Sequence, residues 1–434
     1  MFAVIRNSWA LLFGILLLMI GNGLHGTLLG VRGDIEGFST AQLSIVMSAY
    51  FAGFLGGSQA APLMIRRVGH IRSFAALGSL ISAALILFPV LVDWISWTVL
   101  RAIIGFCFSA VYVTAESWLN NSSTNENRGQ TLSIYLITQM SGVVIAQSLL
   151  VLGDPAGFTL FIVLSVLVSV SFAPILLSVT PIPPFETTKP MGLMEVFRIS
   201  PLGCVGMFML GGIYSAMFGM SAVFGTEARL SLGQISAFVA SFYVGGLLLQ
   251  YPIGWLSDRM DRRLLIMAVA ALAGLAGMAG FWGAGVFTVI LAAGFVYGGM
   301  ANPLYALLLA HTNDFLETEQ MPAAGGRLVF ITGVGAIFGP LLVGQVMNGV
   351  GAAGFFLFLT IAAALLAAYA LYRTGVRPAA DASETESYAA ILPQSGQVFM
   401  EAAQDYYAEA VEEATDGDAP QDPADPQTAP AAGG

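Results

Sequence analysis

The sequence has few charged residues and few cysteines, and each scarcity excludes a class of protein. Only 10% of the 434 residues are charged, whereas 57% are hydrophobic. A soluble domain has about a quarter of its residues charged and could not keep this much apolar surface from water. The two cysteines, Cys107 and Cys204, lie inside apolar segments and suggest neither a disulfide framework nor a metal site. The sequence therefore predicts a membrane protein.

Motifs of nucleotide use and of common catalysis are also missing. The chain contains no phosphate-binding loop of the G-x-x-x-x-G-K-S type, no H-E-x-x-H pair and no cysteine–histidine metal spacing. No nucleophile and base occur at a recognisable spacing, which argues against an intramembrane enzyme. We expect no cofactor, no metal ion and no nucleic-acid partner.

Long apolar runs, by contrast, recur along most of the chain. A run of about twenty residues crosses a hydrocarbon core of about 30 Å. The first run is too long and too uncharged at its flanks for a cleaved signal, so we expect it to remain as a spanning helix. We predict an all-α membrane protein with twelve transmembrane helices, at 8–29, 42–64, 71–91, 95–118, 131–152, 156–177, 200–224, 233–255, 264–283, 286–309, 326–347 and 353–373.

The basic residues set the predicted orientation, because Lys and Arg in short loops resist export across the membrane. Arg32 and Arg229 fall on one side of the predicted helices. The other basic loop residues fall on the opposite side: Arg6, Arg66, Arg67, Arg72, Arg128, Lys189, Arg198, Arg259, Arg262, Arg263, Arg327, Arg373 and Arg377. We therefore expect a multi-pass protein of the cytoplasmic (inner) membrane with both termini in the cytoplasm.

The net charge of -10 comes from the end of the chain. Residues 375–434 hold twelve acidic residues against one basic residue, Arg377. This composition predicts a solvated, disordered acidic tail. Within it, residues 397–414 can form one acidic helix for a protein partner, or the whole tail can be passive; composition leaves both open.

One six-helix unit is written twice in the sequence. An offset of 192 residues aligns STAQLSIVMSAYFAGFLGG (39–57) with SLGQISAFVASFYVGGLLL (231–249), and an offset of 193 aligns Gly105, Tyr112 and Asn120 with Gly298, Tyr305 and Asn313. A Pro-rich stretch of mixed charge, 180–201, separates the copies. We expect an N-terminal six-helix bundle at 1–181, a central cytoplasmic loop at 182–199, a C-terminal six-helix bundle at 200–374 and the acidic tail at 375–434.

Several motifs resemble those of the major facilitator superfamily. GWLSDRMDRR (254–263) is similar to the superfamily's loop pattern G-x-L-a-D-R-x-G-R-R, and RAIIGFCFSA (101–110) to its pattern of an Arg followed four residues later by Gly. ESWLN (116–120), NPLY (302–305) and the first loop without Asp more narrowly resemble the YcaD-like subfamily. Helix 131–152 lacks the G-P pair of many antiporters, whereas GAIFGPLLVG (335–344) contains one. These departures argue against drug–proton antiport but not against the superfamily.

The resemblance implies two six-helix bundles that rock about a cavity at the membrane midplane. With no nucleotide site, the energy must come from an ion or solute gradient. We therefore expect a secondary active transporter of a small organic solute, monomeric in the lipid bilayer and coupled to a proton. The alternative is a transporter-like receptor or assembly factor that acts through its acidic tail.

One helix of each copy carries a stripe of polar or small residues. In helix 95–118 the spacing of 4, 4, 3 and 4 places the members within about 80° of one another. They are Arg101, Gly105, Ser109, Tyr112 and Glu116. Helix 286–309 repeats the spacing without either charge, in Gly294, Gly298, Asn302, Tyr305 and Leu309.

An ionisable group inside a membrane costs several kcal/mol and needs an explanation. Arg101 either snorkels to the outer interface or has a buried role; the resemblance favours a buried contact with substrate or with the proton path. Glu116, within reach of Asn120, is either a proton-binding carboxylate or a structural acid that ties this helix to the backbone of a neighbour. His25, close to Asn22, is either a titrating group or a hydrogen-bonded packing residue. The predicted pathway comprises Asn22, His25, Arg101, Ser109, Tyr112, Glu116, Asn302 and Tyr305.

The two equivalent loops differ in sign, because PLMIRRVGHI (62–71) has Arg66 where GWLSDRMDRR has Asp258. The resemblance implies that the acid faces a helix start in the opposite half, here near Arg128, and holds the cytoplasmic side shut. For Arg66 and Arg67 we predict a latch of reversed sign against the acids of 311–327, although both can simply fix orientation. The predicted cytoplasmic gate is Arg66, Arg67, Asp258, Arg259, Arg262, Asp314, Glu317 and Glu319.

Overall fold

The computed structural model describes residues 2–121, 125–177, 191–317 and 320–376, and every regular element in these ranges is an α-helix. The first six helices are α1 (Phe2–Ile35), α2 (Thr40–Val68), α3 (His70–Leu87), α4 (Trp94–Asn121), α5 (Asn125–Leu152) and α6 (Thr159–Leu177). A short helix, α7 (Leu193–Ile199), lies within the predicted central loop. The last six are α8 (Pro201–Glu227), α9 (Leu232–Ser257), α10 (Arg262–Trp282), α11 (Phe287–Asn313), α12 (Met321–Val350) and α13 (Gly354–Val376).

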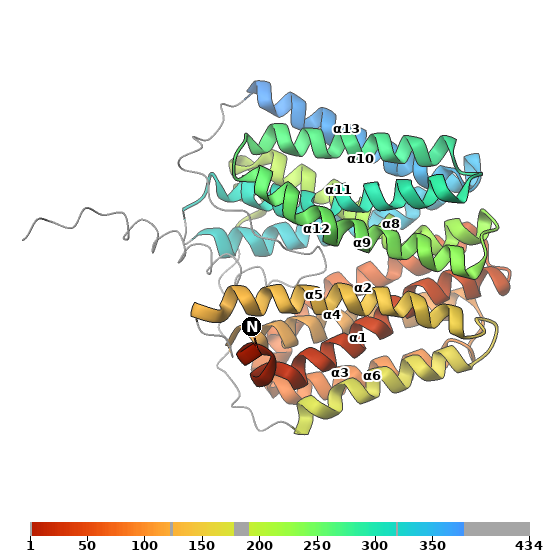
Figure 1. Ribbon diagram of the computed structural model, residues 1–434. Coiled ribbons are helices and arrows are strands. Elements are labelled where there is room, and N and C mark those ends of the chain that lie inside the picture. The colour runs from red at the N-terminus through yellow and green to blue at the C-terminus, as the bar shows by residue number, and fades with distance from the viewer. Residues whose placement is uncertain (1, 122–124, 178–190, 318–319, 377–434) are drawn as a thin grey trace, which may run out of the picture.

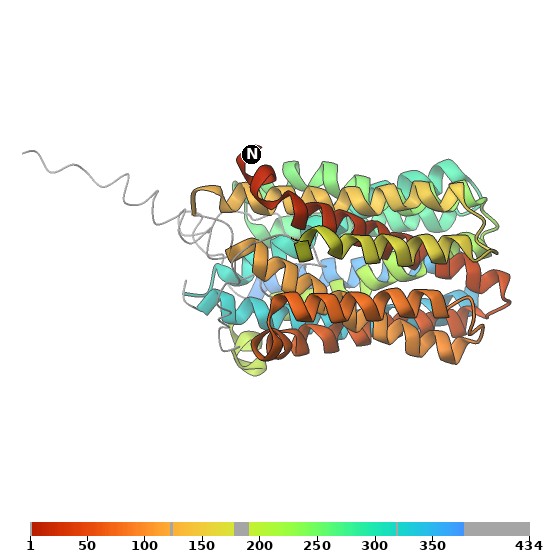
Figure 2. The ribbon, with the colours of Figure 1, turned by 90° about the horizontal axis from the view of Figure 1, so that it is seen from below.

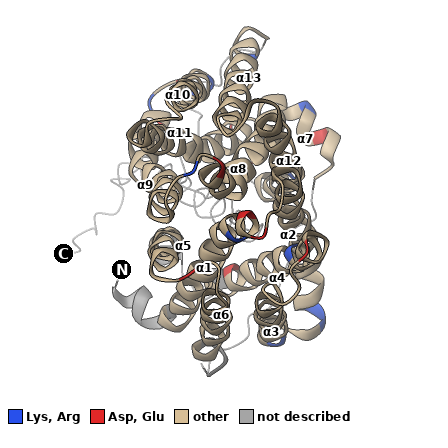
Figure 3. Cartoon of the chain, turned by 90° about the vertical axis from the view of Figure 1, so that its right-hand side faces the viewer, with Lys and Arg blue, Asp and Glu red and all other residues tan. Residues whose placement is uncertain are grey.

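The long helices run side by side in one elongated bundle (Figures 1 and 2). Seen from one end, α1–α6 form one group and α8–α13 form the other, which we call the first and second halves (Figure 3). We call the end where α1 begins and α13 ends the terminal end, and the opposite end the distal end (Figure 1). Within the part of the chain described, the prediction of twelve long helices is confirmed.

Most of the long helices can cross a membrane by length and composition. Ten of them meet this test within the described ranges. The two others are α2, which carries several Ser and Gln residues, and α6, whose apolar part spans only Thr159–Pro174. The predictions for the acidic tail beyond residue 376 and for Glu319 lie outside the described residues.

The sequence repeat appears as two equivalent helix crossings. A Cβ atom on Gly53 of α2 would overlap the carbonyl oxygen of Ala102, and one on Gly105 of α4 would overlap that of Tyr50. In the second half, Gly245 of α9 and Gly298 of α11 approach α11 and α9 in the same way. Only glycine allows two helix backbones to come this close.

The two halves are packed together at the distal end. Ser48 of α2 donates a hydrogen bond to the carbonyl oxygen of Ile337 in α12, at 2.6 Å, and the Thr40 hydroxyl donates to the Glu227 carboxylate at the end of α8. A Cβ on Gly30 of α1 would lie 2.7 Å from the Cβ of Ala222 in α8. These contacts, which we call the distal seal, hold helices of the two halves in direct contact at this level.

Candidate functional site

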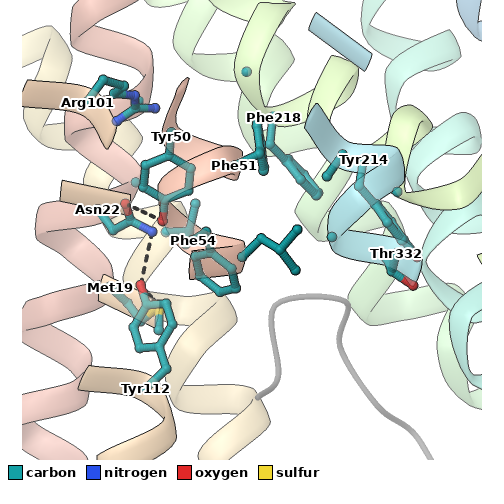
Figure 4. Close-up of a pocket in the computed structure, with 18 of the residues that line it drawn as sticks. Met19, Asn22, Tyr50, Phe51, Phe54, Arg101, Tyr112, Tyr214, Phe218 and Thr332 are labelled. Carbon is teal, nitrogen blue, oxygen red and sulfur yellow. Dashed lines mark hydrogen bonds between the residues drawn. The ribbon is translucent and has the colours of Figure 1, made fainter. Parts of the chain in front are cut away.

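A cavity lies between the two halves, on the terminal side of the distal seal (Figure 4). It contains about 1160 Å³ of atom-free space, its mouth included. The first half contributes side chains from α1, α2, α4 and α5, and the second half from α8, α9 and α12. A cavity formed by both halves is the place where a relative movement of the halves changes access.

Arg101 is the most polar group of this cavity. Its side chain is 96% buried, so the prediction of a buried Arg is supported over the snorkelling alternative. Its Nη1 lies 2.7 Å from Nδ1 of His25, and its Cζ lies 4.4 Å from the centre of the Tyr50 ring. A guanidinium only donates, so Nδ1 of His25 must accept, and the ring proton of a neutral His25 is on Nε2. Arg101 thus sits against neutral partners.

Asn22 links three helices beside Arg101. Its amide oxygen accepts a hydrogen bond from the Tyr50 hydroxyl at 3.2 Å, and its amide nitrogen donates to the Tyr112 hydroxyl at 3.0 Å. Figure 4 shows Arg101, Tyr50, Asn22 and Tyr112 one below another along the wall of the first half. The predicted pathway residues Asn22, Arg101 and Tyr112 therefore meet at the cavity, and His25 contacts Arg101.

Glu116 lies further toward the terminal end of α4 and is 98% buried. Its carboxylate accepts a hydrogen bond from the Tyr135 hydroxyl of α5 at 2.8 Å. Among the described residues, Glu116 is not one of those that line the cavity. The side chain of Asn120, its predicted neighbour, is outside the described part. The geometry fits both the structural and the proton-binding reading of this acid.

The other three predicted pathway residues are buried in helix packing. Asn302 donates a hydrogen bond to the carbonyl oxygen of Gly298 in its own helix at 2.8 Å. Ser109 is buried, with no hydrogen-bond partner for its hydroxyl in the structure, and Tyr305 is also buried. In the described part of the chain, none of the three lines the cavity. The stripe of α11 therefore does not mirror that of α4 in exposure to the cavity.

The wall of the second half is aromatic, and sequence reasoning missed it. The rings of Tyr214 and Phe218 in α8 are nearly parallel, with centroids 6.0 Å apart, and Tyr243 of α9 stacks on Phe218 at 4.7 Å. The Tyr214 hydroxyl is tied to the carbonyl oxygen of Ala301 at 2.8 Å. Aromatic residues are common throughout this sequence, so composition offered no signal for these three. We call them the aromatic wall.

Several charged residues at the terminal end form ion pairs within the second half. Asp314 forms an ion pair with Arg262 of its own half, and both side chains are 97% buried. Asp258 lies 4.0 Å from the same Arg262, and Arg259 stacks on Trp255 at 4.1 Å. Asp314 thus neutralises a buried cation of its own half, and its predicted contact with Arg66 and Arg67 stays a prediction.

The remaining members of the predicted gate are exposed or not described. Arg66, Arg67 and Glu317 are exposed. Glu319 and the Arg128 side chain, the predicted neighbour of Asp258, fall outside the described part. A reversed latch between Arg66 and Glu317 therefore stays a prediction.

The family follows from comparison with known proteins. The model of the Major Facilitator Superfamily matches residues 11–232 and 202–404, which together span most of the chain. The chain belongs to this superfamily. Its relatives include the "Uncharacterized MFS-type transporter YcaD" of Escherichia coli O6:K15:H31, which is 26% identical over 79% of this chain and 89% of the relative. An MFS-type transporter of Enterobacter sp. (strain 638) is 25% identical over 86% of this chain and 97% of the relative.

Solved structures of two transporters share the fold. A point mutant of the nucleoside transporter NupG gives a TM-score of 0.70 at 13% identity, covering 84% of this chain and 99% of that one. A bacterial homologue of the human lysosomal transporter Spinster, in an inward-facing, unoccupied conformation, gives 0.61 at 12% identity, with coverages of 92% and 97%. The resemblance to the superfamily and to YcaD-like proteins is thus confirmed, and the protein is a multi-pass membrane transporter.

Proposed function

We propose that the protein is a secondary active transporter that moves a small organic solute through the cavity by alternating access, coupled to protons. The observation that carries the proposal is the cavity itself, whose walls belong to different halves and whose distal side is closed by the distal seal. Separation of the halves at that seal would open the cavity to the other side of the membrane. No further domain is needed for this cycle.

The orientation of the cycle follows from the basic residues. Because Arg and Lys concentrate at the terminal end, we place both termini in the cytoplasm and the distal seal toward the outside of the inner membrane. Residues 1–181 and 200–374 then act as the two moving units, joined by the central loop. We propose that one chain, a monomer, is sufficient, because the cavity is complete within it.

Two buried titratable groups bear on proton coupling. Glu116 is enclosed in the first half, where it accepts a hydrogen bond from Tyr135, and a carboxyl group in such apolar surroundings is costly to keep ionised. His25 accepts from Arg101, and a second proton on its ring would place two cations 2.7 Å apart and break that contact. We assign the proton to Glu116, and His25 to positioning Arg101.

Transport in liposomes tests this proposal. Counterflow of candidate solutes first identifies a solute that the reconstituted full-length protein carries. An imposed pH gradient should then drive its accumulation. Glu116→Gln should lose this accumulation and keep solute exchange, whereas Asp34→Asn, which changes an exposed acid at the distal end, should keep both. Accumulation that ignores the pH gradient in the unmodified protein would reject the coupling.

A separate measurement addresses the acidic tail. If the protein acts instead as a receptor or assembly factor through residues 378–434, deleting them should abolish its cellular function while solute exchange persists. A truncated protein that retains its cellular function would reject that alternative.

A further inference from the structure

We infer that the transported solute is an aromatic carboxylate whose carboxylate binds Arg101 and whose ring lies against the aromatic wall. This inference rests on the proposed function and names the substrate class of the same cavity. It follows from three features: the charge of the cavity, the unused donors of Arg101, and the mutually stacked rings of the facing wall.

The cavity has an unbalanced positive charge. Among the described residues that line it, Arg101 is the one charged side chain, and the rest are apolar, aromatic, hydroxyl or amide groups. Its contacts are with a neutral imidazole, a tyrosine ring and, through Nη2 at 3.8 Å, the sulfur of Met47. A buried cation is costly unless an anion accompanies it. The cavity therefore favours an anion over a neutral or cationic solute.

One edge of the Arg101 guanidinium is left for a ligand. His25 takes Nη1, and Tyr50 covers one face of the group at 4.4 Å. Nε is buried without a hydrogen-bond partner in the structure, and the sulfur near Nη2 is a weak acceptor. The Nε–Nη2 edge presents two parallel N–H groups, and a planar carboxylate accepts both. His25 and Tyr50 thus hold Arg101 in place, and its Nε–Nη2 edge remains available to a ligand.

The facing wall fits a planar ring. Figure 4 shows Arg101 on one side of the cavity and Tyr214 and Phe218 on the other. Tyr214, Phe218 and Tyr243 are already aligned by stacking on one another, so their faces are fixed before a solute arrives. A ring that stacks on such a group gains about 0.5–1.5 kcal/mol beyond its apolar burial. Arg101 belongs to the first half and these three rings to the second, so a solute that contacts both touches both halves.

Because Arg101 and the aromatic wall lie in different halves, a bound solute can affect how the halves move relative to each other. A molecule that bonds Arg101 through one end and the aromatic wall through the other bridges both halves at once. Either contact alone leaves one half unoccupied. A compound that offers only the charge or only the ring should therefore bind more weakly than one that offers both.

A matched set of probes separates the contribution of the carboxylate charge to binding from that of the aromatic ring. We would measure thermal stabilisation of the purified full-length protein by 2-naphthoate, 2-naphthamide, 2-naphthylmethylamine and decahydronaphthalene-2-carboxylate, because a ligand of the folded state raises its apparent stability. The acid should bind about tenfold or more tightly than the amide and the amine, since a bidentate charged pair is lost in both. It should bind roughly three- to tenfold more tightly than the saturated acid, which cannot stack. An amide or amine that binds as tightly as the acid overturns the anion site.

Substitutions assign each preference to a residue. Arg101→Gln should remove the preference for acid over amide, and Arg101→Lys should retain only part of it, because an ammonium lacks the planar two-donor edge. Phe218→Leu should lower the preference for the aromatic over the saturated acid and leave the acid–amide preference intact. Phe338→Leu, which changes an exposed aromatic residue outside the cavity, is the control and should alter neither. If the Arg101 variants do not fold, the probe series on the unmodified protein decides the question.

The two proposals fail in different ways. A protein that carries a neutral or cationic solute and shows no preference for acids rejects the aromatic carboxylate but keeps the transporter. A protein that exchanges no solute in liposomes across a broad screen, acids included, rejects the transporter itself. Uptake of 2-naphthoate by the unmodified protein, reduced at least tenfold in Arg101→Gln, supports both.

Discussion

The two halves descend from one pattern of residues, and α4 and α11 show where they diverged. Both helices keep the glycine that crosses a partner helix, Gly105 and Gly298, and both keep a tyrosine seven residues later, Tyr112 and Tyr305. Only α4 keeps charges. Gly294 stands where α4 has Arg101, and a Cβ there would lie 2.5 Å from the Ser241 hydroxyl, so no larger side chain fits without movement. The two halves therefore share the glycine packing of these helices, but only the first half has charged residues on the equivalent helix.

The same contrast holds at the terminal-end loops. Asp258 and Asp261 of the second half correspond to Arg66 and Gly69 of the first. Asp261 caps α10 by accepting from the amide of Arg263 at 2.9 Å, whereas Gly69 precedes α3 at a φ of +86° without a side-chain cap. The second half stabilises its loop with ion pairs of its own, whereas Arg66 and Arg67 in the loop of the first half are exposed.

We expect the largest effect from a substitution that breaks the buried Asp314–Arg262 ion pair of the second half. Asp314→Asn leaves the Arg262 guanidinium buried without its main counter-ion, and such a loss costs about 3–5 kcal/mol. Arg66→Gln, at the exposed arginine of the first half, should cost about 1 kcal/mol or less, because solvent screens exposed charges. Unfolding of both variants in detergent, followed by heat or denaturant, measures the difference. Equal destabilisation would mean that the two loops are not built differently.

The equivalent tyrosines offer a second test, through transport. Tyr112→Phe removes the acceptor of the Asn22 amide at the cavity wall, and an unsatisfied polar group of this kind costs about 1–3 kcal/mol. We expect the KM of the carried solute to rise about tenfold. Tyr305→Phe changes a residue that does not line the described cavity and should alter stability while KM stays unchanged. A larger change of KM in Tyr305→Phe would place the pathway in the second half instead.

The smallest expected effect concerns the helix cap and depends on pH. The hydrogen bond from Arg263 to Asp261 holds the pKa of the Asp261 carboxyl below its usual value. Because the folded-state pKa is lowered, the stabilisation is present above the ordinary pKa of Asp and is lost as the pH falls through the lowered value. Asp261→Ala should cost about 1 kcal/mol at pH 7, and the cost should shrink in acid. The difference in unfolding midpoint between the variant and the parent protein, measured from pH 7 down to pH 3, checks this; a constant difference would contradict it.

The sequence predicted the helices and the first-half wall well, for identifiable reasons. Apolar runs report helix length and a constant residue offset reports a repeat, so the helices and the duplicated six-helix unit could be found. Arg101, Asn22 and Tyr112 stood out because polar groups are rare in an apolar chain. The aromatic wall could not be found, because Tyr214 and Phe218 look the same in a sequence as any packing residue. The pairing of Asp314 with Arg262 was not foreseen, because a charge pattern gives the sign of a partner but not its distance.

Pro340 of α12 gives one final consequence. A proline has no amide hydrogen, so the carbonyl oxygen of Ala336, one turn earlier, receives no hydrogen bond from position 340. Ala336 lines the cavity, while Ile337 accepts from Ser48 at the distal seal. The helix is therefore easiest to bend at the level where the cavity meets the distal seal. A bend at this point would move Ile337 of the distal seal and Ala336 of the cavity wall together.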